Sequence, residues 1–229
     1  MTSQITTLFD MQDNAEKIRD RIAAILKLEL DNQKILAENN QYTENKKDFD
    51  IKVYLENSRP WELTSDSADK NPFPLINVGL HETREDMSPG STVCNVKYIG
   101  TFYIDCCACG NFNENQDNYM SDDSLSTFKA WQLARIVRGI LMSGHYAYLG
   151  MQRVVRRRRI TKISTLIPSG LQDAAISITI CRIFFEVDFH ETSSEAQGVN
   201  FDEMIFTATS HNGEVNLINI SHDYTKNKE

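Results

Sequence analysis

The sequence contains no long hydrophobic run. Its longest strongly apolar stretch, residues 176–180, is far shorter than the ~20 residues that a helix needs to cross a bilayer. Residues 1–13, MTSQITTLFDMQD, also lack the basic start and the apolar stretch of a secretory signal. We therefore expect a soluble protein that is made and used inside a cell, with no membrane partner.

Cysteine is scarce, and catalytic motifs are absent. The chain has 5 cysteines, at positions 94, 106, 107, 109 and 181. Their odd number and uneven spacing argue against a disulfide framework and favour a reducing compartment. The sequence also has no G-x-S-x-G, no phosphate-binding P-loop and no G-x-G-x-x-G. We expect no catalytic residue, no cofactor and no bound metal, and so no enzymatic activity.

Apolar and charged side chains are present in ordinary amounts, 41% and 24% of the 229 residues. These values are typical of globular proteins, and the length fits one sizeable domain or one domain with extensions. The formal net charge is -8. The molecule as a whole therefore repels nucleic acid and anionic membrane surfaces.

Residues 13–37 have the spacing of an amphipathic helix. The apolar residues Ile18, Ile22, Ile25, Leu26 and Leu30 recur at intervals of three and four, with charged residues between them, and Leu36 is a further candidate for this stripe. The helix has Asp13 or Asn14 available as a cap, since either side chain accepts hydrogen bonds from the free amides of a first turn.

A second helix is expected at about residues 125–143. Its predicted cap is Asp122, Asp123 or Ser124, and Gly144 is its predicted end. Its predicted apolar stripe comprises Phe128, Trp131, Ala134, Val137, Ile140 and Leu141.

Strands are expected between and after these helices. Alternation predicts a strand around residues 51–55 and a longer one over residues 96–108, and β-branched and aromatic residues predict strands at 153–166 and 174–189. In the last of these the apolar phase shifts after Ile180, which indicates a bulge or burial on both faces. A loop is expected over about residues 64–90, within which residues 75–82 form a short strand.

These elements predict an α+β fold, with a mixed or antiparallel sheet flanked by the two helices. We expect one domain over residues 1–190. Residues 191–229 are expected to form a separate extension, with a β-hairpin turning at Asn212-Gly213 and a frayed end.

Two residue clusters resemble sites of chemistry. The cluster Cys106, Cys107 and Cys109 has no second cysteine pair to complete a zinc tetrahedron, so burial as packing side chains is favoured over a metal or redox role. Similarly, His81 with Glu82 and Glu85 has no HExxH spacing, and a surface role is favoured.

A basic run is the strongest candidate for a binding site. It comprises Arg153, Arg156, Arg157, Arg158, Arg159 and Lys162. Side chains alternate along a strand, so this run places cations on both faces, which indicates an edge strand. Three interpretations remain open: a subunit interface, a solvated edge, or contact with the DNA backbone. The predicted acidic complement includes Asp117, Asp122 and Asp123 and the segment 186–195.

The order of elements is similar to that of tailed-phage tail terminators and related neck or tail-completion proteins. The segments that carry this resemblance are IRDRIAAILKLEL, DFDIKVYLENSRPWEL, VKYIGTFYIDCCACG, STFKAWQLARIVRGILMS, YAYLG and AAISITICRIFFEVDF, within residues 15–190. The resemblance rests on order and spacing rather than on a diagnostic motif.

The resemblance implies a structural virion protein. Such proteins form rings, commonly hexamers, that cap the tail tube and join it to the head. The implied partners are further copies of the chain, the tail tube protein, a neck or connector protein and a sheath protein, with DNA only passing through the ring. A head-proximal neck or connector-completion protein is the alternative. A metal-binding protein using Cys106–Cys109 and a DNA-contacting protein are further alternatives.

Overall fold

The computed structural model describes residues 12–39, 49–60, 73–88, 95–110, 121–168, 177–192, 204–209 and 215–220. The chain divides into two compact units. One unit is Phe9–Thr192, and the other consists of Ser193–Glu229 with Met1–Leu8. The larger unit holds both helices and the main sheet, so it is the unit in which a site is sought.

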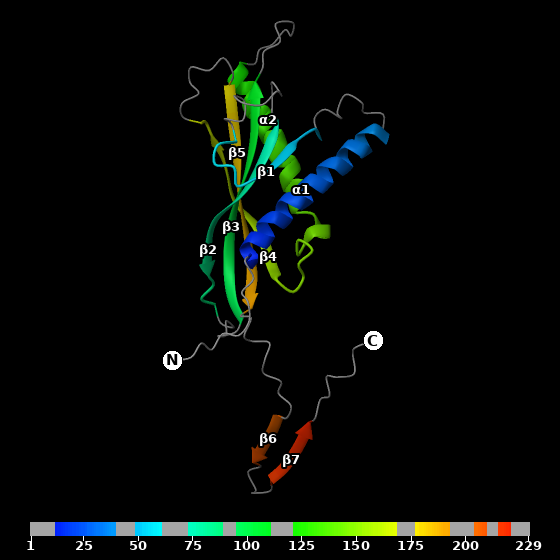
Figure 1. Cartoon of the computed structure of the whole chain (residues 1–229), viewed down its shortest axis with the longest axis vertical. Helices are drawn as coiled ribbons and strands as arrows, with labels where there is room; N and C mark the ends of the chain where they lie inside the picture. Colours follow the sequence, from blue (N-terminus) through cyan, green and yellow to red (C-terminus); the bar gives the residue numbers. More distant parts are fainter. Residues whose placement is uncertain are drawn as a thin grey trace. The chain divides into compact units, whose positions relative to one another are not determined.

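The main sheet has five strands (Figure 1). They are β1 (Lys52–Leu55), β2 (Leu75–Glu85), β3 (Asn95–Gly110), β4 (Val155–Leu166) and β5 (Ser177–Thr192). Their spatial order is β1-β2-β3-β5-β4. Only β1 and β2 are parallel, and every other neighbouring pair is antiparallel. The predicted mixed sheet of an α+β fold is confirmed.

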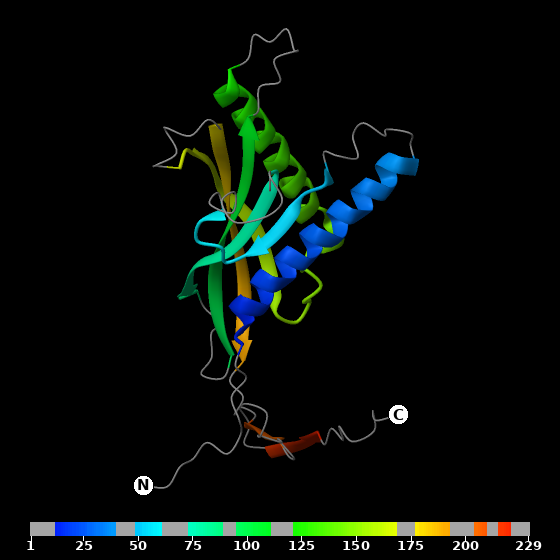
Figure 2. The same cartoon turned by 45° about the horizontal axis from the view of Figure 1, so that its top comes forward.

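Helices α1 (Asn14–Asn39) and α2 (Asp122–Leu141) pack against the same side of this sheet (Figure 2), which we call the helix face. The core there combines Ile22 and Leu26 of α1, Val137 of α2, and Phe102 and Phe185 of the central strands. All of these side chains are almost completely buried. Burial of apolar area on this face is therefore the main force that joins the helices to the sheet.

The first helix agrees with its prediction. Asp13 accepts a hydrogen bond from the Glu16 amide at 2.8 Å, and Glu16 accepts one from the Asp13 amide at 3.3 Å. This reciprocal pair satisfies amides that a first helical turn leaves free. The predicted apolar stripe is buried from Ile18 to Leu30, whereas Leu36 at its end is 42% exposed. Local capping and tertiary packing thus select the same helix.

The start of α2 corrects the prediction. Its cap is Ser121, whose hydroxyl accepts a hydrogen bond from the amide of Ser124 at 3.3 Å. The predicted caps Asp122 and Asp123 lie in the first turn instead, where their charge favours the positive end of the helix. The helix also ends at Leu141, before the predicted Ser143. Ser121, Asp122, Asp123 and Ser124 all have side chains that can cap a helix, so residue type alone does not identify the cap. Ser121 has the extended backbone conformation that a cap requires.

The predicted apolar stripe of α2 is partly wrong. Phe128 is 50% exposed and Trp131 is 44% exposed. The buried residues are Ser126, Ala130, Leu133, Ala134, Val137 and Leu141. Small side chains at Ala130 and Ala134 let the helix approach the sheet closely, so the helix turns these residues inward and leaves the two aromatic rings outside.

The short strand expected over residues 75–82, within the expected loop 64–90, is confirmed as β2, Leu75–Glu85. This strand pairs with β1 on one side and with β3 on the other. Ile76 and Val78 are fully buried on the helix face. The strand extends three residues beyond the predicted residue 82, so residues 83–85 correct the expected loop.

The phase shift in β5 is explained by burial on both faces. The ladder with β3 runs from Ser177 to Thr192 without a register shift, so no bulge is present there. Ile183 and Phe185 pack on the helix face. Ile180 packs on the opposite face against Leu75 and Cys107.

The second unit contains the predicted hairpin. Strands β6 (Met204–Thr209) and β7 (Val215–Ile220) form a two-stranded antiparallel sheet. The register pairs Met204 with Ile220 and Thr209 with Val215. The predicted turn at Asn212-Gly213 and the predicted frayed end lie outside the described residues.

Candidate subunit interface

The basic run lies on β4, at one edge of the main sheet, except for Arg153, which precedes this strand. The strand order places β4 last, with β5 as its partner. The prediction of an edge strand is confirmed. An edge strand presents a row of unpaired N–H and C=O groups on its free side, so its side chains decide what can approach.

Arg158 is used inside the subunit. Its Nη1 donates to the carbonyl oxygen of Leu141, and its Nη2 donates to that of Ser143 at 2.6 Å. Its Nε donates to the carbonyl oxygen of Ala147 at 3.2 Å. The last carbonyl groups of a helix lack helical partners and carry partial negative charge. Arg158 therefore caps α2, and the desolvation that accompanies this position lowers the pKa of its guanidinium.

Arg159 is also paired within the chain. Its Nε donates to Glu186 Oε2 at 2.7 Å, and its Nη2 lies 2.6 Å from the same oxygen. The hydrogen bond to Glu186 raises the pKa of Arg159. Glu186 receives a second cation, Arg84, at 3.6 Å. Glu186 thus serves first as an intramolecular partner, although the sequence suggested it as a complement for a neighbour.

The remaining cations of the run point outward. Arg153, Arg156, Arg157 and Lys162 are exposed, and the first three form no ion pair with residues in the described ranges. The ammonium of Lys162 lies 5.7 Å from the ring centroid of Phe184. We call residues 153–162 the basic edge. Its exposed charge comes from these residues rather than from Arg158 and Arg159. Arg156 is close to Asp86 of the same subunit, because hydrogen bonds from Ser88 and the charges of Lys97 and Arg156 lower the pKa of the Asp86 carboxyl group.

One part of the predicted acidic complement, Asp122 and Asp123, lies at the other end of the sheet, whereas Glu186 and Asp188 of the other part lie on β5 beside the basic edge. Asp123 accepts a hydrogen bond from the hydroxyl of Ser177, the first residue of β5. The basic edge pairs with the last part of β5, where Arg157 is opposite Asp188. The structure therefore does not bring Asp122 and Asp123 to the basic run of the same subunit. Asp117 lies outside the described residues.

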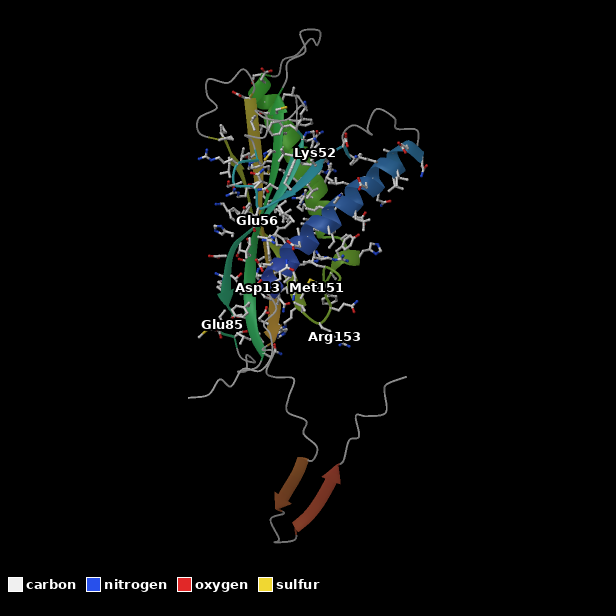
Figure 3. All side chains as sticks on the ribbon, viewed as in Figure 1. Asp13, Lys52, Glu56, Glu85, Met151 and Arg153 are labelled. Carbon is white, nitrogen blue, oxygen red and sulfur yellow. The ribbon has the colours of Figure 1, made fainter. Side chains whose placement is uncertain are left out.

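A second acidic group was not selected from the sequence as an interface. Glu82 and Glu85 are exposed near the end of β2, and Asp86 follows them. Figure 3 shows Glu85 and Arg153 at the same end of the sheet, on opposite sides of the ribbon. We call residues 82–86 the acidic edge. Its signal in the sequence is the run HETRED, whose His81, Glu82 and Glu85 resemble a metal site only in residue type.

The polar face of the sheet, opposite the helices, carries an internal ion pair. Asp105 is 1% exposed and accepts hydrogen bonds from Arg182 Nε at 2.7 Å and Nη2 at 2.8 Å. The Arg182 guanidinium lies 4.8 Å from the ring centroid of Tyr103. This ring lies across Gly79, where an added Cβ would meet ring atoms at 2.1 Å. The charges of Asp105 and Arg182 therefore compensate each other within the chain, and we interpret this pair as structural.

The cysteines of the described ranges are buried thiols. Cys106 and Cys181 face each other across β3 and β5 on the helix face, and Cys107 packs on the polar face. Burial raises the pKa of Cys106 and Cys107 well above the ordinary value, and that of Cys181 to about 11. Metal binding and nucleophilic attack need the thiolate. This environment supports the packing interpretation; Cys94 lies outside the described residues.

His81 contacts an aromatic ring and is not part of a cluster of metal-binding side chains in the described ranges. Its imidazole meets Phe184 edge-on, with 5.7 Å between the ring centroids. Among the residues that the structure describes, no group of three or more histidine, cysteine or acidic side chains could hold a metal ion. No helix in the same part of the chain is both long enough and apolar enough to span a membrane.

Comparison of the sequence with models of known protein families and with curated proteins finds no match.

Proposed function

We propose that this protein is a structural subunit of a ring, a tail terminator that caps the tail tube of a phage and joins it to the head. The support is the resemblance in element order together with the exposed basic edge. The basic edge carries the proposal, because Arg153, Arg156 and Arg157 hold charge that the described part of the subunit leaves without an ion pair. Cations placed on a sheet edge are suited to an acidic partner surface.

The charge distribution favours a partner that presents a different surface. Two basic edges placed together would oppose arginine to arginine, which is repulsive. A ring needs contacts in which one patch meets another patch on the next subunit, since this geometry closes a cycle. The chain as a whole has a net charge of -8, so further copies can supply the acidic surface.

The direct test is imaging of the purified full chain mixed with tail tubes. We expect negative-stain images to show a ring at one end of the tube. Co-purification with tubes rather than with portal-containing heads would separate the tail terminator from the neck or connector-completion alternative. If no ring and no end-bound density form under any condition, the proposal is wrong.

A matched pair of variants relates this test to the basic edge. The double variant Arg156→Glu/Arg157→Glu reverses two exposed charges of that edge, and Arg135→Glu/Arg138→Glu reverses two exposed charges of α2. We expect only the first to prevent ring formation. Salt-dependent binding of the wild-type chain to DNA, lost in the first variant while rings persist, would favour the DNA-contacting alternative instead.

A further inference from the structure

We propose that the acidic edge of one subunit pairs strand to strand with the basic edge of the next, so that the sheet continues from copy to copy around the ring. This inference rests on the proposed ring function and adds to it the partner surface of β4. The partner is a second copy of this chain. Four features of β2 and β4 support this pairing: their free sides, their level in the sheet, their direction and their charge.

Both strands have a free side. β2 pairs with β1 only over Leu75–Val78. Beyond this, the carboxylate of Glu56 accepts a hydrogen bond from the Leu80 amide at 2.8 Å. Past Leu80, no strand of the described ranges lies on that side of β2, and β4 likewise has only β5. Both edges therefore present backbone groups that can extend a sheet.

The regular segments within the charged parts of the two edges have the same length. On β2, a register shift between Leu80 and Glu82 is followed by a regular run to Glu85. On β4, register shifts occur before Arg157 and after Ile160, and the residues between them pair regularly. Bulges at edges limit where another strand can add. The acidic edge therefore offers the segment 82–85 and the basic edge offers the segment 157–160, and β4 pairs regularly again over Lys162–Leu166.

These segments also lie at the same level of the sheet. Glu82 is opposite Thr101 of β3, and Thr101 is opposite Glu186 of β5. Glu186 is in turn opposite Arg159 of β4. A copy displaced sideways along this row brings its acidic edge next to the basic edge of its neighbour.

The strand directions suit this contact. Each step from β2 to β3, β5 and β4 is antiparallel, so β2 and β4 run in opposite directions. A copy that adds by sideways displacement and rotation places its β2 antiparallel to the neighbouring β4. Antiparallel ladders are slightly more stable per residue than parallel ones, and the contact joins two different surfaces, as a closed ring requires.

The charges select the same pairing. Charged residues on an edge strand often serve to prevent pairing, and charges of like sign on two edges repel one another. Here Glu82 and Glu85 stand on one edge, and Arg156 and Arg157 stand on the other. The opposite signs attract unlike edges and repel like ones.

Charge exchange between subunits tests the proposal. The variants are Glu82→Arg/Glu85→Arg and Arg156→Glu/Arg157→Glu in the full chain. We expect each variant alone to associate about tenfold or more weakly than the wild type in analytical ultracentrifugation, because like charges then meet. A chain that carries all four substitutions restores opposite charges and is expected to regain the oligomer. Circular dichroism of each variant checks that it is folded, and Arg135→Glu/Arg138→Glu is the matched control.

Single cysteines give a second measurement that does not depend on charge. One subunit carries Thr83→Cys and another carries Thr161→Cys, both at exposed positions of the two edges. With a short bismaleimide, we expect covalent dimers from the mixture and none from either variant alone.

The outcomes separate the two proposals. If the wild type forms rings while the charge variants form them equally well and the mixed cysteine variants do not cross-link, the edge pairing is wrong and the ring function stands. Cross-linking within either single variant also overturns the pairing, because it would show like edges together. If the wild type forms no ring in solution or on tail tubes, both proposals fail.

Discussion

The helix face and the polar face of the sheet are stabilised by different interactions, although they belong to the same strands. On the helix face, Phe102, Ile104 and Phe185 join the two helices in one apolar core. On the polar face, Asp105 and Arg182 form a bidentate ion pair beside Tyr103. Apolar burial stabilises through the area removed from water, whereas the ion pair must first offset the cost of desolvating its charges.

The difference between the helix face and the polar face bears on which surfaces are available for assembly. A subunit with one apolar face needs both helices there, and this arrangement leaves β4 at the end of the strand order. The charges of the polar face are paired within the chain at Asp105 and Glu186. The acidic and basic edges, by contrast, carry exposed charge, and another subunit can meet it there.

The largest expected effect comes from adjacent phenylalanines on opposite faces. Phe185→Ala removes a fully buried ring from the helix face and should lower the free energy of unfolding by about 3–5 kcal/mol. Phe184→Ala removes a half-buried ring that contacts His81 and Lys162 on the polar face, and should cost about 1–2 kcal/mol. Urea denaturation monitored by circular dichroism measures both.

The milder Phe185→Leu keeps the measurement possible if Phe185→Ala does not fold. It should lie between the wild type and the alanine variant. Equal losses at positions 184 and 185 would contradict the proposed difference between the two faces.

The next largest loss of stability is expected at the ion pair of the polar face. Arg182→Met leaves the Asp105 carboxylate buried without its cation, and should cost about 3 kcal/mol. The double variant Asp105→Leu/Arg182→Met removes both charges and should recover most of this loss. Urea denaturation of Arg182→Met, Asp105→Leu and the double variant measures the free energy of unfolding of each. Additive losses would show that the two residues act independently, against the interpretation of a coupled pair.

The sequence predicts elements well where local and tertiary preferences agree. In α1, the capping pair of Asp13 and Glu16 and the spacing of the isoleucines indicate the same helix that packing stabilises. In α2, the hydrophobic spacing is compatible with two faces. Packing against the sheet selects the small residues Ala130 and Ala134 over Phe128 and Trp131, and hydrophobicity alone ranks these residues in the opposite order.

The candidate interface was predictable as a strand edge but not in its detail. Cations on both faces of β4 indicated the edge, since such a strand cannot be buried. Which arginines stay free depends on contacts distant in sequence, such as that of Arg158 with the end of α2 and that of Arg159 with Glu186. The acidic edge was missed because its position depends on the register of β2, which no local pattern determines.

The smallest expected effect concerns His190, which stands on the polar face near the basic edge. Burial lowers the pKa of its imidazole, and the nearby positive charges of Arg156 and Lys97 lower it further. The folded state therefore binds fewer protons than the unfolded state just below the ordinary value of 6.5. It follows that stability falls as pH decreases through this range towards the folded pKa.

Arg156→Gln removes one of these positive charges and should raise the His190 pKa and reduce this loss of stability. NMR titration of the imidazole measures the pKa, and denaturation at several pH values measures the stability. Arg135→Gln, on the exposed side of α2, is the control and should leave the titration unchanged. An unchanged or lower His190 pKa in Arg156→Gln would show that the charge of the basic edge does not extend onto the polar face, and would confine its action to partners that approach β4 from outside.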